Sequence, residues 1–113
     1  MNKFEPYVYV LIPVKDRAEY LYHTLRTCEI QTYKKLRVIV SDDCSTDNTR
    51  EVVEAARSRD LRISYVTPGV DVGMKRNFEF ALDQADQGYV MFLGGDDGLM
   101  PGAIERMVQR IME

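Results

Sequence analysis

The sequence has few of the residues on which metal-rich or disulfide-bonded proteins depend. Its 113 residues include one histidine, which excludes a histidine-rich metal site. The two cysteines, Cys28 and Cys44, form neither a C-x-x-C pair nor another metal-ligand spacing. We therefore expect free thiols and a cytoplasmic location, because a reducing compartment keeps cysteines unpaired.

Long apolar runs and an excess of positive charge are also missing. No apolar stretch reaches the roughly 18 residues of a membrane-spanning helix, and the amino terminus lacks the apolar core of a signal peptide. The net charge of −3 argues against a nucleic-acid partner, because binding a polyanion needs a basic face. A chain of 113 residues is long enough for one compact domain and too short for two.

Glycine-rich phosphate-binding motifs are absent as well. Neither G-x-G-x-x-G nor G-x-x-x-x-G-K-[ST] follows any of the apolar runs. If the protein binds phosphates, a metal ion or arginine and lysine side chains must therefore neutralise their charge.

What the sequence does contain is a regular alternation of strand and helix patterns. Apolar runs predict strands at 7–12, 36–41, 61–67 and 89–93. Helical spacing of apolar residues predicts four helices, with Asp16 as a cap of the first and Pro101 in the first turn of the last. Met74 and Phe78 are expected on the apolar stripe of the third helix. The alternation predicts a Rossmann-like α/β three-layer sandwich, with helices flanking a mostly parallel sheet of about four strands.

Acidic clusters follow two of the predicted strands. Asp42 and Asp43 come after the second strand, and Asp96 and Asp97 follow the fourth, between glycines. Open α/β sheets bind ligands at the carboxyl ends of their strands. Carboxylates at that edge suit Mg²⁺ or Mn²⁺, a ribose and a nucleotide base. The combination indicates nucleotide-sugar chemistry.

Each of these candidates also has a purely structural interpretation. The second cluster can be an acidic turn that caps the last helix, and Ser45, Thr46 and Asp47 are natural helix caps. We favour Asp42 as the ligand-facing residue and Asp47 as a cap. Arg76, at the start of the third helix, can reach a base or a phosphate, or can remain a solvated surface side chain.

Taken together, the motifs resemble the amino-terminal half of a glycosyltransferase family 2 enzyme, which has the GT-A fold. The similarity extends over residues 8–111, with several motifs in the right order and spacing, and the segment 38–49 is the most specific of them. The matching motifs are Val10-Leu11-Ile12-Pro13, Asp16 to Leu21, Thr24-Leu25, Gln31-Thr32-Tyr33, Val38 to Thr49, Gly73, Arg76-Asn77, Ala81, and Tyr89 to Leu93 with the Asp96-Asp97 loop.

This resemblance implies a role for each matching site residue. The segment that contains Pro13, Val14 and Asp16, together with the Asp42 side chain, would bind the nucleobase, typically uracil. Arg76 would approach the base or the phosphates.

The Asp96-Asp97 loop would stand for the D-x-D element of the family. In that role Asp96 and Asp97 would bind the ribose and the Mn²⁺ or Mg²⁺ ion that bridges the diphosphate. Three departures from the family pattern affect the expected donor and the strength of metal binding. Gly94 or Gly95 replaces the first acid of D-x-D, Lys15 stands where an aromatic residue often stacks on the base, and Asp16 replaces an asparagine.

The resemblance therefore implies the donor-binding domain of an inverting transferase that moves a sugar from a nucleoside-diphosphate sugar, with UDP-sugar the expected donor, to a saccharide or lipid-linked acceptor. The general base of the family lies beyond the matched segment, so no catalytic residue is assigned. We expect residues 1–113 to be one domain of a longer enzyme and to be inactive alone. The full-length protein could form a homodimer or lie at the inner face of a membrane. The alternative is a degenerate nucleotide-binding module without transfer activity.

Overall fold

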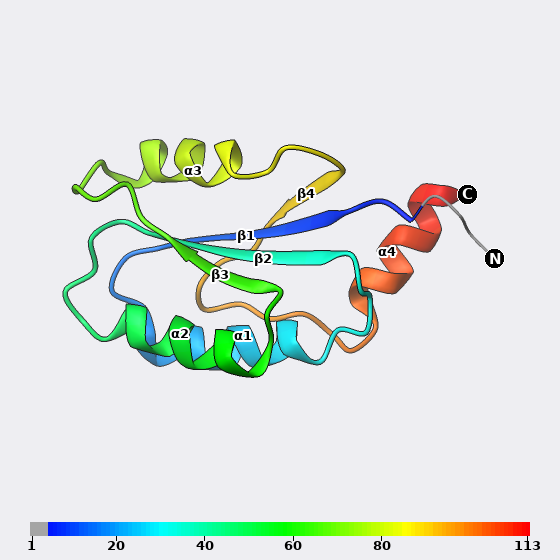
Figure 1. Ribbon diagram of the computed structural model, residues 1–113, viewed down its shortest axis with the longest axis horizontal. Helices are drawn as coiled ribbons and strands as arrows, with labels where there is room; N and C mark the ends of the chain where they lie inside the picture. Colours follow the sequence, from blue (N-terminus) through cyan, green and yellow to red (C-terminus); the bar gives the residue numbers. More distant parts are fainter. Residues whose placement is uncertain (1–4) are drawn as a thin grey trace.

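The computed structural model describes residues 5–113, in which strands and helices alternate from one end to the other (Figure 1). The elements in chain order are β1 (Val8–Val14), α1 (Ala18–Glu29), β2 (Leu36–Asp42), α2 (Thr49–Arg59), β3 (Ile63–Val66), α3 (Met74–Asp83), β4 (Tyr89–Phe92) and α4 (Ala103–Met112). The predicted order of elements is therefore confirmed, and the predicted strand bounds differ from these by one or two residues.

The four strands form one parallel sheet in the order β3-β2-β1-β4. β1 and β2 run in register from the Val8–Leu36 pair to the Val14–Asp42 pair, so their carboxyl ends lie side by side. Helices α1 and α2 cover one face of the sheet and α3 covers the other (Figure 1). This arrangement confirms the predicted three-layer α/β sandwich.

The continuous apolar sequence of β1 reflects burial on both faces of the strand. Val8, Val10 and Ile12 point into the larger core beneath α1 and α2. Tyr9 and Leu11 point into a smaller core beneath α3. A strand covered by helices on both sides needs apolar residues at every position. Each fully buried aliphatic side chain contributes about 1.5–3 kcal/mol, so these cores hold the strand ends firmly in place.

β4 departs from the expectation of a buried strand. Tyr89, Val90 and Phe92 are 44%, 40% and 43% exposed. The reason is position, because β4 lies at the edge of the sheet and β1 is the strand that pairs with it within residues 5–113. The Phe92 ring instead stacks on Phe78 of α3, with ring centroids 5.1 Å apart.

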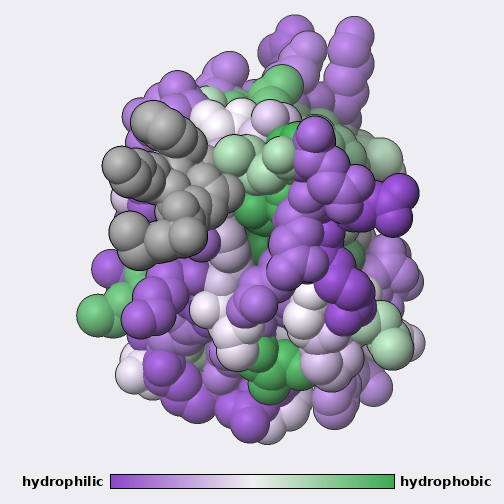
Figure 2. Space-filling model, turned by 90° about the vertical axis from the view of Figure 1, so that its right-hand side faces the viewer, coloured by the Kyte–Doolittle hydropathy of each residue, from purple (hydrophilic) through white to green (hydrophobic). Residues whose placement is uncertain are grey.

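Helix α4 begins two residues later than predicted. Gly102 precedes it in the left-handed conformation, with a φ of 74°, so Pro101 lies in the turn before the helix and not in its first turn. Ile104 and Val108 anchor α4 to the larger core. The end of the molecule near α4 presents a largely hydrophilic surface with small apolar areas (Figure 2). Among residues 5–113, no helix has both the length and the apolar character needed to cross a membrane.

Candidate functional site

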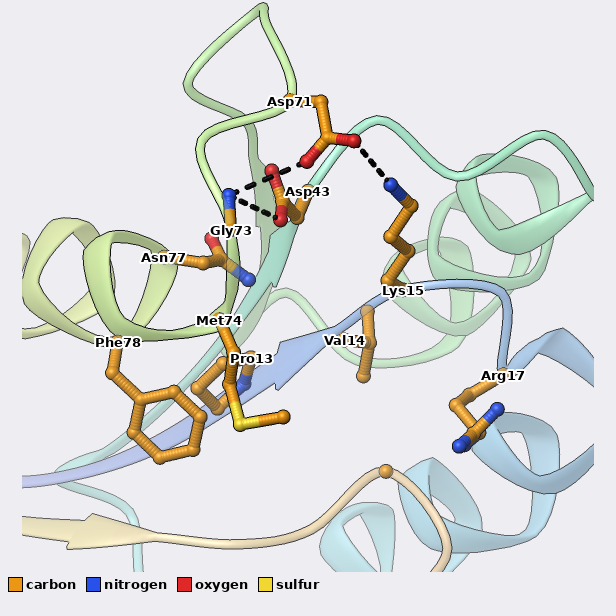
Figure 3. Close-up of a pocket in the computed structure, with 11 residues that line it drawn as sticks. Pro13, Val14, Lys15, Arg17, Asp43, Asp71, Gly73, Met74, Asn77 and Phe78 are labelled. Atoms are coloured by element: carbon orange, nitrogen blue, oxygen red, sulfur yellow. Dashed lines mark hydrogen bonds and ion pairs between the residues drawn. The ribbon is translucent and has the colours of Figure 1, made fainter.

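A cavity of about 410 Å³ opens at the carboxyl ends of β1 and β2, the edge at which open α/β sheets bind ligands (Figure 3). Its walls come from the end of β1 and the loop after it, the loop between β3 and α3, the first turns of α3, and the loop after β4. The lining residues are Pro13, Val14, Lys15, Arg17, Asp43, Asp71, Gly73, Met74, Asn77, Phe78 and Gly95.

Asp43 ties one wall of this cavity together. Its two carboxylate oxygens accept hydrogen bonds from the backbone N–H groups of Val72, at 2.8 Å, and Gly73, at 3.1 Å. The side chain is only 3% exposed, yet it lines the cavity. Asp43 therefore holds the β3–α3 loop against the end of β2 and places a carboxylate in the wall of the cavity.

Asn77 joins the start of α3 to the end of β2 by two hydrogen bonds. Its amide nitrogen donates to the Ser41 carbonyl at 3.0 Å, and its amide oxygen accepts from the Ser41 hydroxyl at 2.6 Å. Both side chains are buried. Because the pair satisfies its own polar groups, α3 meets β2 at a defined position, and Met74 and Phe78 then lie along the cavity.

An ion pair joins the two loops across the cavity. The Lys15 ammonium lies 2.6 Å from the Asp71 carboxylate, which also accepts from the Gly73 N–H (Figure 3). The hydrogen bond with Asp71 raises the pKa of Lys15, and the same bond lowers the pKa of Asp71. Both groups are exposed, so the pair adds little stability, and it places one positive and one negative charge in the cavity wall.

Asp42, the residue favoured to face a ligand, has protein partners. One carboxylate oxygen accepts from the Ser45 N–H, at 3.0 Å, and from the Ser45 hydroxyl, while the other accepts from the Tyr65 hydroxyl at 2.7 Å. Burial, followed by the bond to Asp42, raises the pKa of Tyr65 to about 12. Asp42 is 2% exposed and does not line the cavity, because it points to the turn that contains Cys44, whose φ is 55°.

Two other acids build the loops around the site. Asp47, predicted to cap α2, lies one residue before the N-cap position, Asn48. It accepts from the Thr49 N–H at 3.1 Å and from the Ala18 N–H at the start of α1. Burial acts to raise the pKa of Asp47, but hydrogen bonds from Thr49 and Ala18 outweigh it and lower the pKa. Asp16, expected to cap α1, instead accepts from the N–H groups of Thr46 and Asp47. The N–H at the start of α1 is therefore bonded to Asp47, in the loop between β2 and α2, while the Asp16 carboxylate points to that loop. Asp16 has a φ of 53°, in the left-handed region.

The Asp96-Asp97 loop presents its carboxylates differently. Both side chains are exposed, and within residues 5–113 no group donates a hydrogen bond to either carboxylate. A Cβ atom at Gly94 would lie 2.7 Å from Asp97 Oδ2 and 3.2 Å from Asp96 Oδ1, so the two carboxylates converge on this glycine. A Cβ at Gly95 would lie 2.7 Å from Val14, which shows how closely the loop approaches the cavity wall.

This pair of carboxylates suits a divalent cation that shares its ligands with a phosphate. Residues 5–113 contain no cluster of three or more metal-ligating side chains. Mg²⁺ bound together with a nucleotide commonly takes only one or two protein carboxylates and completes its shell with phosphate oxygens and water. Asp96 and Asp97 provide that number of hard oxygen ligands, in an accessible position.

Of the residues predicted for the site, Pro13 and Val14 line the cavity. Asp96 and Asp97 do not line it, but they directly follow Gly95, which does. The structure does not bring Asp16, Asp42 or Arg76 into the lining, and Arg76 is exposed near the start of α3.

Sequence reasoning missed several lining residues. Arg17 lines the cavity, and its guanidinium has a single hydrogen bond within residues 5–113, to the Asp16 carbonyl. Met74 and Phe78 were assigned to the apolar stripe of α3 but are 77% and 38% exposed. Helical spacing identifies an apolar face, but it does not show where a helix projects past the sheet edge.

Comparison with known proteins agrees with this architecture. The model of the family Glycosyl transferase family 2 matches residues 9–113, and this chain belongs to that family. The chain is 35% identical to GalNAc(5)-diNAcBac-PP-undecaprenol beta-1,3-glucosyltransferase of Campylobacter jejuni, over 96% of its own length. It is 30% identical over its whole length to the putative teichuronic acid biosynthesis glycosyltransferase TuaG of Bacillus subtilis. The chain spans 35% and 45% of the lengths of these two relatives.

A solved structure with the same fold is that of Staphylococcus aureus TarS in complex with UDP-GlcNAc. It superposes with a TM-score of 0.86 and 27% identity, over 94% of this chain and 31% of the TarS chain. The predicted family and fold class are thereby confirmed.

Proposed function

We propose that this chain is the donor-binding domain of a glycosyltransferase that uses a nucleoside-diphosphate sugar, with a uridine nucleotide as the preferred donor. The observation that carries this proposal is the position of the cavity, next to a pair of converging carboxylates on the carboxyl edge of one parallel sheet. The complex of the similar TarS with UDP-GlcNAc supports it.

In this proposal the nucleobase occupies the cavity. Asp43 accepts the imide N–H of uracil, a role that the sequence had favoured for Asp42. Asp43 lines the cavity, whereas Asp42 is already bonded to Ser45 and Tyr65. The backbone at Pro13 and Val14 contacts one side of the base, and Phe78 offers an apolar surface.

The diphosphate then lies toward the loop after β4. Asp96 and Asp97 would hold Mn²⁺ or Mg²⁺ together with the phosphates, and Asp96 would also accept from a ribose hydroxyl. When bound there, a divalent cation would offset the negative charge of the departing diphosphate. Arg17 takes the phosphate-facing role that was predicted for Arg76, because Arg17 lines the cavity and Arg76 does not.

The proposed reaction is a single displacement. The acceptor hydroxyl forms a bond to the anomeric carbon while the bond to the diphosphate oxygen breaks, which inverts the configuration, and the hydroxyl proton passes to a general base. We place that base and the acceptor site in a part of the enzyme outside residues 1–113. The chain spans less than half the length of the two relatives described above, which supports this division. We expect no sugar transfer by the 113-residue chain alone.

Calorimetric titration of the chain with UDP, CDP and GDP, with and without Mn²⁺, tests the proposal. We expect UDP to bind most tightly and Mn²⁺ to increase its affinity at least about tenfold, since the ion joins the carboxylates to the phosphates. The matched variant Asp96→Asn should lose this increase while it still binds uridine. Absence of nucleotide binding would contradict the proposal. Binding without any effect of Mn²⁺ would favour a nucleotide-binding module that lacks transfer activity, the interpretation that Gly94 or Gly95 in place of an acid suggests.

A further inference from the structure

A polar row runs along the side of α1 that faces the acidic loop. It consists of Thr24 and Thr27 within the helix and Gln31 just beyond its end, and we call these three residues the α1 row. Thr24 is 1% exposed and Gln31 is 3% exposed. Spacings of three and four residues place them on one face of the helix. Buried polar side chains need partners. Each member of this row reaches a backbone carbonyl of α1 itself, and its remaining partners lie in the segment from Gly95 to Ile104.

Thr24 holds the backbone on both sides of Asp96. Its hydroxyl lies 2.9 Å from the carbonyl oxygen of Gly95 and 2.5 Å from that of Asp97, with its single proton available to either. The N–H of Asp97 in turn donates to the Gly94 carbonyl at 3.0 Å and closes the turn. The backbone of Asp96 is therefore fixed from the helix side, while its carboxylate remains exposed.

The other two members of the row hold the rest of the segment. The Thr27 hydroxyl accepts from the Leu99 N–H at 3.0 Å. A Cβ atom at Gly98 would lie 3.2 Å from Thr27 Cγ2, so the loop packs closely against the helix at this glycine. The Gln31 amide donates to the Met100 carbonyl at 3.0 Å and accepts from the Ile104 N–H at 3.2 Å. Four backbone groups of one segment can thus be bonded at the same time to the three side chains of the α1 row, and a fifth lies within reach of the Thr24 hydroxyl.

Such an arrangement does more than satisfy buried polar atoms. Within residues 5–113 the carboxylates of Asp96 and Asp97 have no hydrogen-bond donors of their own, so the backbone is the part of these residues that the protein holds, and it sets the direction in which each side chain leaves the chain. Groups that bind a metal or a charged ligand work best when a second layer of residues holds them in place. Gln31 also belongs to the Gln31-Thr32-Tyr33 motif, for which the site described above has no use.

We propose that Thr24, Thr27 and Gln31 are positioning residues, which set the geometry of the Asp96-Asp97 pair for the cation and the diphosphate. This inference rests on the proposed function, because it concerns how that site is held. It predicts that the α1 row affects the metal-dependent part of donor binding and leaves the base-binding cavity unchanged.

The test compares Thr24→Val with Thr24→Ser and with Thr49→Val in the 113-residue chain. Thr24→Val removes one buried hydroxyl with little change of shape, and Thr24→Ser keeps it. Thr49→Val is the matched control, since Thr49 is also fully buried and its hydroxyl bonds to Asp47, away from the acidic loop. Calorimetry measures uridine binding without metal and UDP binding with Mn²⁺, and thermal unfolding shows that each variant is folded.

We expect Thr24→Val to weaken UDP binding in Mn²⁺ about tenfold, as loss of a supporting residue does at other metal sites. Uridine binding should be unchanged in this variant, and Thr24→Ser and Thr49→Val should behave like the wild type. Equal UDP affinity in wild type and Thr24→Val, or an equal loss in Thr49→Val, would overturn the inference and leave the proposed function standing.

Failure of the wild type to bind UDP in Mn²⁺ would instead overturn the proposed function, and the inference with it. If Thr24→Val does not fold, Thr27→Val replaces it, with Thr27→Ser as the variant that keeps the hydroxyl. The same tenfold loss, confined to UDP with Mn²⁺, is then the supporting result, and an unchanged affinity is the contradicting one.

Discussion

The two acidic pairs of this chain look alike in sequence and behave in opposite ways in the structure. Asp42 and Asp43 lie at the carboxyl end of β2, are almost fully buried, and accept hydrogen bonds from three other segments: the turn at Ser45, strand β3 and the β3–α3 loop. Asp96 and Asp97 follow β4 and are exposed, and within residues 5–113 nothing donates to their carboxylates. The first pair is bonded mainly within the protein, and only the second pair has both carboxylates free of protein donors among the described residues.

The difference shows that protein partners, and not the residue type, determine what a carboxylate can do. A buried carboxylate must have hydrogen-bond donors, and once these come from the protein its capacity for a ligand falls. Asp43 lies between the two extremes, because it is bonded to the backbone and still lines the cavity.

The largest effect expected from this comparison is on stability. Asp42→Ala should lower the free energy of unfolding by about 3 kcal/mol, because the Tyr65 hydroxyl and the Ser45 N–H lose their charged acceptor inside the protein. Asp96→Ala should change it by less than about 0.5 kcal/mol, because no partner is lost. Urea denaturation of both variants measures the difference, and similar losses in the two would break the comparison.

An intermediate effect should appear at alkaline pH through Tyr65. Its pKa is raised from the usual tyrosine value of 10.0 to about 12 in the folded chain. Because the folded pKa is the higher one, the contribution of this group is complete below pH 10 and is lost as the pH rises toward 12. Tyr65→Phe should therefore be less stable than the wild type by about 1.5 kcal/mol at neutral pH, with the gap closing between pH 10 and 12. Tyr20→Phe, at an exposed position of α1, should show no such gap in the same denaturation series.

The smallest effect is expected from a substitution that moves the carboxylates of Asp96 and Asp97 apart. Gly94→Ala would place a methyl group 2.7 Å from Asp97 Oδ2 and 3.2 Å from Asp96 Oδ1, so the carboxylates must move apart. Since both side chains are exposed and can turn aside, stability should change by less than about 0.5 kcal/mol. The affinity for UDP in the presence of Mn²⁺ should fall about threefold. This is smaller than a tenfold change, which corresponds to about 1.4 kcal/mol of binding free energy. Calorimetry with uridine as the metal-independent control checks this, and an unchanged UDP affinity would show that the carboxylates need not converge.

Much of the fold could be predicted because its signals are local. Runs of apolar residues identified the strands, and helical spacing identified the helices, since burial imposes these periods on the sequence. The contact of Asp47 with the start of α2 agrees with the preference of carboxylates for helix starts, although the N-cap position itself is Asn48. The exposure of β4 could not be predicted, because it depends on the order of the strands in the sheet and not on the composition of the strand.

The ligand-facing residue of the first acidic pair was harder to predict. Successive residues of a strand point to opposite faces of the sheet. Asp42 and Asp43 are adjacent at the end of β2, so their side chains point in different directions. The sequence favoured Asp42, but in the structure Ser45 and Tyr65 take up its carboxylate. Arg17 was missed for a similar reason, because a lone arginine in a loop looks like any surface residue until the cavity beside it is known.

The alternation of strands and helices, the family, and the acids at the end of β2 and after β4 can all be recognised in the amino-acid sequence. Each of these follows from the chemistry and spacing of neighbouring residues. Which acids remain available to a ligand depends on the folded chain, because the donors that bond to Asp42 and Asp43 include residues 65, 72 and 73. The contacts of Thr24, Thr27 and Gln31 with the Asp96-Asp97 loop also depend on the folded chain, since those bonds join residues about 70 positions apart in the chain.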